Sequence, residues 1–155
     1  MPTPDRDTTL QRLRGALDAF ISELERLPPE RFLARTDGWS PRDVAAHIVG
    51  WLRLTIAGAV DLRRGATPSY FADADNDLAT VNEGHVRRYD STGRRQIVAE
   101  LRASFAELDA FVRGIPAEAW SADTGVRYRG RSTTVAGRVA VLVGDIDAHR
   151  EELRA

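Results

Sequence analysis

Apolar residues recur every three or four positions along most of the chain, which is the spacing of amphipathic helices. The first such stretch spans residues 7–27 and ends at Pro28-Pro29. Its apolar positions are Leu10, Leu13, Leu17, Phe20, Leu24 and Leu27. We therefore expect one long first helix with a single buried stripe.

A second helix is marked at its start by residues that cap helices. Ser40 occupies the N-cap position, Pro41 the first helical position, and Asp43 the position from which a carboxylate reaches back to the cap. We predict that this helix continues to about Arg64 and ends at Gly65. A loop containing Pro68 and two aromatic residues is expected over residues 67–75.

Three further stretches keep the helical spacing, at residues 75–89, 97–115 and 133–153. The first two are either one kinked element or two helices, and Thr133 or Thr134 caps the last. Residues 121–132 indicate a loop or at most a small hairpin. The pattern predicts an all-α fold of one domain over residues 1–155, a four-helix bundle with a long crossover connection.

Composition narrows the class of protein. With 155 residues, 43% hydrophobic and 29% charged, the chain has the profile of an ordinary globular domain. No apolar run approaches the roughly 20 residues of a membrane span, and the N-terminus lacks an apolar signal core, so we expect a cytoplasmic protein with no membrane partner. The net charge of −1 argues against a nucleic-acid partner. Because the chain has no cysteine, any metal must bind nitrogen and oxygen ligands.

The three histidines, His47, His85 and His149, each fall on an apolar helical stripe. Asp145 precedes His149 by one helical turn on the same side. Imidazoles that point inward from different helices can form a metal site in a bundle, and two histidines with one carboxylate make a facial ligand set. The pattern therefore indicates a metal site built from His47, Asp145 and His149.

Each of these residues also has a purely structural explanation. A histidine on an apolar stripe can be a core residue hydrogen-bonded to a polar neighbour, in the same neutral form that binds metal. Asp145 can pair with an arginine such as Arg138 or Arg150, or lie at the exposed edge of the stripe. His85 has the weakest case as a ligand, because Gly84 and the arginines after it indicate a helix end near solvent.

The stretch GWSPRDVAAHIVGW at residues 38–51 resembles the second-helix signature of the DinB-like superfamily, and its Gly-Trp ending is closest to the branch typified by the colibactin self-resistance protein. The similarity extends through residues 27–32, Asn82 and residues 144–149. It implies a four-helix bundle with a long crossover and, in many members, a divalent metal held by three histidines. His47 and His149 match two of these, and Asp145 stands at the third position.

This departure leaves two functions open. In the first, zinc, nickel or iron on His47, Asp145 and His149 activates a water or a small thiol, and the enzyme detoxifies small reactive molecules by hydrolysis or thiol transfer. In the second, the bundle binds or sequesters a small-molecule ligand without metal or catalysis. Its cavity would be lined by aromatic residues and a histidine, namely Trp51, Tyr70, Phe71 and His85. A homodimer fits either function, although no heptad seam demands one.

Overall fold

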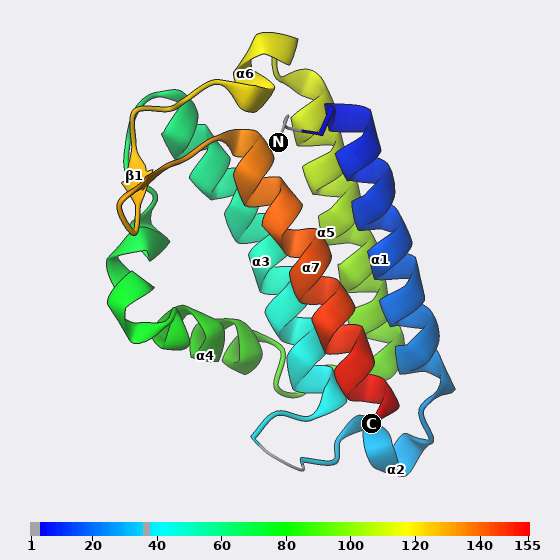
Figure 1. Ribbon diagram of the computed structural model, residues 1–155. Helices are drawn as coiled ribbons and strands as arrows, with labels where there is room; N and C mark the ends of the chain where they lie inside the picture. The colour runs from blue at the N-terminus through cyan, green and yellow to red at the C-terminus, as the bar shows by residue number, and fades with distance from the viewer. Residues whose placement is uncertain (1–3, 36–37) are drawn as a thin grey trace.

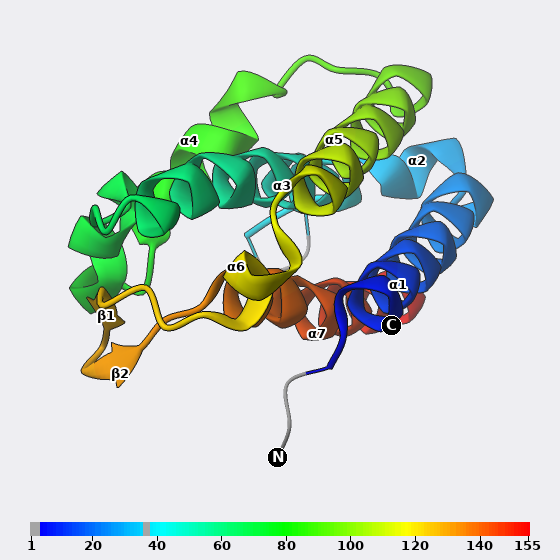
Figure 2. The same cartoon turned by 90° about the horizontal axis from the view of Figure 1, so that it is seen from above.

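The computed structural model describes residues 4–35 and 38–155, and its main body is a bundle of four long helices (Figure 1). These are α1 (Arg6–Arg26), α3 (Pro41–Arg63), α5 (Arg94–Gly114) and α7 (Val135–Arg154). Helix α1 packs beside α7, and α3 packs beside α5 (Figure 2). The predicted all-α bundle is confirmed, and the connection from α3 to α5 is the expected long crossover.

Shorter elements complete the fold. They are α2 (Pro29–Phe32), the 3-10 helix η1 (Ser69–Asn76), α4 (Ala79–Arg88), α6 (Ala117–Ser121) and a hairpin of β1 (Arg127–Tyr128) with β2 (Arg131–Ser132). The hairpin is antiparallel, with Arg127 opposite Ser132. Residues 121–132 therefore contain the small hairpin that the sequence allowed.

The crossover differs from its prediction at one point. Asp77 and Leu78 both have left-handed backbone conformations, with φ of 51° and 61°. This break separates η1, where a loop was expected, from α4, which begins at Ala79 instead of residue 75. Helices α4 and α5 are distinct elements, so the stretch is two helices and not one kinked helix.

The capping signals of the sequence are present at the N-termini of α3 and α7. The Ser40 hydroxyl accepts a hydrogen bond from the Asp43 amide at 3.1 Å, and the Asp43 carboxylate accepts one from the Ser40 amide at 3.0 Å. Thr134 caps α7 by accepting from the Gly137 amide at 2.9 Å. These bonds satisfy amides that have no partner within their helix.

Two arginines satisfy the carbonyl ends of the neighbouring antiparallel helices α1 and α5. Arg94, at the start of α5, donates to three carbonyl oxygens at the end of α1, those of Leu24, Glu25 and Leu27, at 3.3, 3.1 and 2.7 Å. Arg6, at the start of α1, donates to the carbonyls of Val112 and Ile115 at the end of α5, at 3.3 and 2.9 Å. A cation at a helix C-terminus also opposes the helix dipole favourably.

Helix α3 is the most apolar of the long helices and would be long and apolar enough to cross a membrane by those two criteria alone. In the bundle, 61% of its most apolar window is buried. It packs against both α5 and α7. Its hydropathy is accounted for by its central place in the core.

Candidate functional site

His47 of α3 and His149 of α7 face each other across the contact between these helices. Their ring centroids lie 4.9 Å apart with the ring planes at 78°. The Trp39 ring packs on His47 at 5.0 Å between centroids. His47 is half-buried, and its Nδ1 atom is buried without a hydrogen-bond partner among the described residues.

The surroundings of His47 keep its ring neutral. Burial, together with the nearby His149 and His85 rings, lowers the pKa of His47 to about 3, and the Asn82 side chain opposes this shift. Desolvation disfavours the imidazolium ion because charge is poorly solvated in the bundle. A neutral imidazole keeps a nitrogen lone pair, which can bind a metal or accept a proton.

His149 is oriented by a carboxylate on its own helix. Its Nδ1 atom lies 3.0 Å from Oε2 of Glu152. Because an ionised carboxylate only accepts hydrogen bonds, the proton of a neutral His149 ring resides on Nδ1. The lone pair is then on Nε2, which is the arrangement that outer-shell carboxylates impose on metal-binding histidines.

Asp145 lies one turn before His149 on α7 and is exposed. Partial burial of its carboxyl group nevertheless raises the pKa of Asp145, and the charges of His149 and Arg138 oppose this shift. Within residues 4–35 and 38–155, no three histidine, aspartate or glutamate side chains are gathered as a metal site. The structure therefore pairs His47 with His149 and leaves Asp145 one helical turn away on α7.

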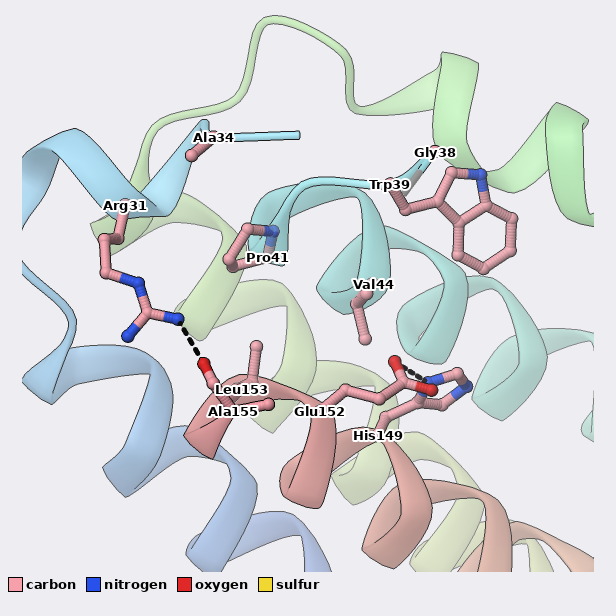
Figure 3. Close-up of a pocket in the computed structure, with 10 residues that line it drawn as sticks. All are labelled: Arg31, Ala34, Gly38, Trp39, Pro41, Val44, His149, Glu152, Leu153 and Ala155. Atoms are coloured by element: carbon pink, nitrogen blue, oxygen red, sulfur yellow. Dashed lines mark hydrogen bonds and ion pairs between the residues drawn. The ribbon is translucent and has the colours of Figure 1, made fainter. Parts of the chain in front are cut away.

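A pocket of about 670 Å³ opens beside this pair, between the segment before α3 and the end of α7 (Figure 3). Its apolar wall includes Trp39, Pro41, Val44 and Leu153, and its polar groups include His149 and Glu152. It is lined by Arg31, Ala34, Gly38, Trp39, Pro41, Val44, His149, Glu152, Leu153 and Ala155. The pocket is large enough for a small-molecule ligand.

The four residues predicted to line a cavity lie elsewhere, between α3 and the crossover. The Trp51 ring contacts Tyr70 at 5.1 Å and His85 at 5.4 Å, and Tyr70 contacts Phe71 at 5.0 Å between centroids. The Trp51 indole donates to the Asn82 side-chain oxygen at 2.7 Å. These rings form a continuous aromatic row along α3 that does not line the pocket of Figure 3.

Two glycines of α3 allow side chains of the crossover to pack directly against the backbone of this helix. A Cβ atom on Gly50 would overlap the His85 ring, and one on Gly58 would lie 2.9 Å from Cε1 of Tyr70. His85 is therefore half-buried against α3, whereas the sequence placed it near solvent. Burial, followed by the charge of Arg88, lowers the pKa of His85 to about 4. Its Nε2 atom is also buried without a partner among the described residues.

Sequence reasoning missed one contact of Glu152 and one of Arg138 in this region. Glu152 stands three positions after His149, a helical spacing that could have indicated the contact. Arg138 places its guanidinium carbon 4.9 Å from the Tyr128 ring and 5.9 Å from the rings of Tyr70 and Phe71. That contact joins α7, η1 and the hairpin. Because these segments are far apart in the chain, the spacing of residues along α7 does not predict it.

Comparisons with known proteins agree with this fold. A family model described as the DinB superfamily matches residues 9–153. A protein from Streptococcus pneumoniae is similar with a TM-score of 0.82 and 18% identity, covering 99% of this chain and 91% of that one. Among curated proteins no match is found.

Other similar structures carry descriptive names. The mycothiol-dependent maleylpyruvate isomerase has a TM-score of 0.77 and 16% identity, covering 100% of this chain and 62% of the isomerase chain. The colibactin self-resistance protein, in complex with double-stranded DNA, has a TM-score of 0.75 and 14% identity, covering 99% of this chain and 95% of that one. At such identities, these likenesses describe the fold alone.

Proposed function

Because the chain belongs to the DinB superfamily, we propose that it is a metal-dependent enzyme that acts on small reactive molecules by hydrolysis or thiol transfer. His47, Asp145 and His149 are the proposed ligands of one divalent metal. The observation that carries the proposal is the pair of rings from α3 and α7, 4.9 Å apart beside a pocket.

The donor set fits zinc, nickel or iron in its chemistry. His47 has a buried Nδ1 atom without a partner among the described residues, and the Glu152 contact leaves the lone pair of His149 on Nε2. Asp145 supplies an oxygen donor one turn away. When bound, such a metal lowers the pKa of a coordinated water or thiol and so supplies a nucleophile at neutral pH.

The residues of the chain have separate tasks in this proposal. Glu152 holds the His149 proton at Nδ1, as described above. Trp39 covers one side of His47 and limits the access of water to it. The pocket beside His149 receives the small molecule, and its apolar wall favours a ligand with an apolar portion.

The named relatives support the proposal in part. A mycothiol-dependent isomerase has a similar fold over 62% of its chain, which supports the thiol-transfer part of the proposal. The DNA complex of the colibactin self-resistance protein concerns that protein. For this chain we propose a small-molecule ligand, since its net charge is −1. A cytoplasmic location and a homodimer stay predictions.

A second candidate function is the binding or sequestering of a small molecule without metal. It is favoured by one observation, namely that no three potential ligands are gathered within the described part of the chain. The pocket of about 670 Å³ would serve this function equally well. The two candidates differ in whether His47 and His149 bind metal.

A metal titration separates them. Untagged protein is stripped of metal and titrated with zinc, nickel and ferrous iron by calorimetry. We expect one equivalent to bind, with at least tenfold weaker binding in His47→Ala and His149→Ala. His85→Ala is the matched control and should bind as the wild type does. Duplex DNA is included as a second titrant and should not bind.

Asp145→His extends the test. It restores the three-histidine set that the family resemblance implies and should tighten zinc binding. If the wild type binds none of the three metals while Asp145→His binds zinc, the metal proposal fails for this chain. Metal-free ligand binding is then the better assignment.

A further inference from the structure

We propose that Arg138 is an anion-binding site outside the pocket of Figure 3, and that it takes a small molecule with an oxyanion group, a carboxylate or a phosphate. Since Arg138 does not line that pocket, the inference goes beyond the proposed function and does not rest on it. It assigns a charge to the ligand and a task to an arginine that neither the bundle nor the metal site requires.

Arg138 differs from the other half-buried arginines in its contacts. Six arginines of the described chain are half-buried. Five of them contact a carbonyl or carboxylate oxygen, namely Arg6, Arg42, Arg53, Arg94 and Arg150. Arg138 contacts neither kind of oxygen within residues 4–35 and 38–155. Its Nε atom is buried without a partner there, as are those of Arg42 and Arg150, which each have a carboxylate contact elsewhere on the guanidinium. A half-buried cation without a counter-charge is costly, and a bound anion would offset that cost.

Aromatic rings hold the Arg138 guanidinium in place. Aromatic rings from η1 and the hairpin surround it at 4.9 to 5.9 Å, those of Tyr70, Phe71 and Tyr128. The pKa of Tyr70 is raised by burial, so its phenol is neutral and offers no compensating charge. A fixed guanidinium loses less conformational entropy on binding an anion than a mobile one, and its fork of N–H groups matches the geometry of an oxyanion.

Arg138 lies nearer the start of α7 than Asp145 and His149 do. Arg138, Asp145 and His149 are seven and eleven positions apart, which places them on one side of the helix. With a rise of about 1.5 Å per residue, Arg138 lies about 10 Å from Asp145 and about 16 Å from His149 along the axis. These separations place Arg138 apart from His149, which lines the pocket of Figure 3.

Asp145 sets a condition on this site. As a carboxylate on the same side of α7, it repels an incoming anion and partly cancels the attraction of Arg138 for that anion. A metal bound by Asp145 would remove that repulsion. In metal-free protein, Asp145→Asn should therefore bind anions several-fold more tightly than the wild type.

The test uses untagged protein in EDTA, titrated with benzoate and with its neutral counterpart benzamide while amide signals are followed by NMR. The wild type should bind benzoate at least tenfold more tightly than benzamide. Arg138→Gln should remove this preference, and Arg138→Lys, which keeps the charge but not the fork, should keep part of it. Arg127→Gln, an exposed arginine of the same hairpin region, is the matched control and should behave as the wild type does.

Inorganic phosphate in competition distinguishes the two sources of the oxyanion. Displacement of benzoate by phosphate at lower concentration than by acetate assigns a phosphate, and the reverse order assigns a carboxylate. The proposal is overturned if benzoate and phosphate both fail to bind saturably, if benzamide binds as well as benzoate, or if Arg138→Gln keeps the preference. Because EDTA removes metal, these outcomes do not depend on whether the metal proposal succeeds.

Discussion

Oε2 of Glu152 lies 3.0 Å from Nδ1 of His149 on the same face of α7. The contact joins an exposed carboxylate to a largely buried ring, whose side chain is 18% exposed against 58% for Glu152. Since the carboxylate can only accept, the contact selects one tautomer of the neutral imidazole. It therefore decides which nitrogen of His149 is available inside the site.

We expect Glu152→Ala to remove the preference of the neutral His149 ring for the tautomer with its proton on Nδ1. The ring nitrogens of His149 should then shift in ¹⁵N NMR toward the tautomer mixture of a free imidazole, with less of the Nδ1–H form. The free energy of unfolding should change by less than about 1 kcal/mol, because the pair is exposed on one side. Glu151→Ala removes the neighbouring carboxylate and should leave the His149 signals in place; identical shifts in both variants would contradict the assignment.

The protein should lose stability as the pH falls below about 6.5. His47 and His85 have pKa values of about 3 and 4 in the folded protein, against 6.5 for an unperturbed histidine. The unfolded chain thus binds more protons between these values. The stability present above pH 6.5 is lost as the pH falls through this window, at up to about 1.4 kcal/mol per pH unit for each ring.

Urea unfolding at pH 7, 6 and 5 measures this slope. His85→Gln, which cannot titrate, should show a shallower loss than the wild type, and the difference isolates one ring from all other titrating groups. Parallel slopes for the two proteins would show that His85 is not held neutral by its burial.

Gly50→Ala should weaken the contact between the crossover and α3. The added methyl overlaps the His85 ring, and we expect a net loss of about 1 to 3 kcal/mol despite the better helix propensity of alanine. Gly84→Ala is the matched control, because its Cβ meets nothing within 4 Å on α4. It should stabilise the protein by up to about 1 kcal/mol. Chemical unfolding followed by tryptophan fluorescence measures both, and an equal gain in both variants would refute the close packing.

Arg94→Ala should destabilise the fold by about 1.5 to 3 kcal/mol, because charge-assisted hydrogen bonds to three carbonyl oxygens are lost. Its contact with the Phe32 ring, at 5.0 Å, is lost as well. Arg95→Ala removes the same charge from an exposed neighbour and should change the stability by less than about 0.5 kcal/mol. Thermal unfolding compares the two; similar midpoints would exclude a special role for Arg94.

The long helices and their caps could be predicted because their causes are local. The stripe of α1 and the Ser40 and Asp43 cap depend on residues within a few positions of each other. The left-handed pair Asp77 and Leu78 could not be predicted, since neither is a glycine. In the structure, the amides of Asp77 and Leu78 donate to the carbonyls of Ala74 and Asp73 at the end of η1.

The site could also be predicted only in the part that depends on local spacing. The stripes place His47 and His149 inward, and the structure brings their rings together. His85 was expected at a helix end near solvent because of Gly84 and the arginines after it, but Gly50 on another helix makes room for its ring. Arg138 was considered only as a partner for Asp145, while its aromatic neighbours come from two distant segments. Contacts between segments far apart in the chain decide these features.

Because of the arginine contacts at the two ends of α1 and α5, the length of each helix constrains the length of the other. Arg6 and Arg94 each reach from the start of one helix to the end of its antiparallel neighbour, and both helices are 21 residues long. An insertion of one residue in either helix would advance its end by about 1.5 Å and turn it by about 100°. Only insertions or deletions matched in both helices can keep both contacts, so the lengths of α1 and α5 are coupled.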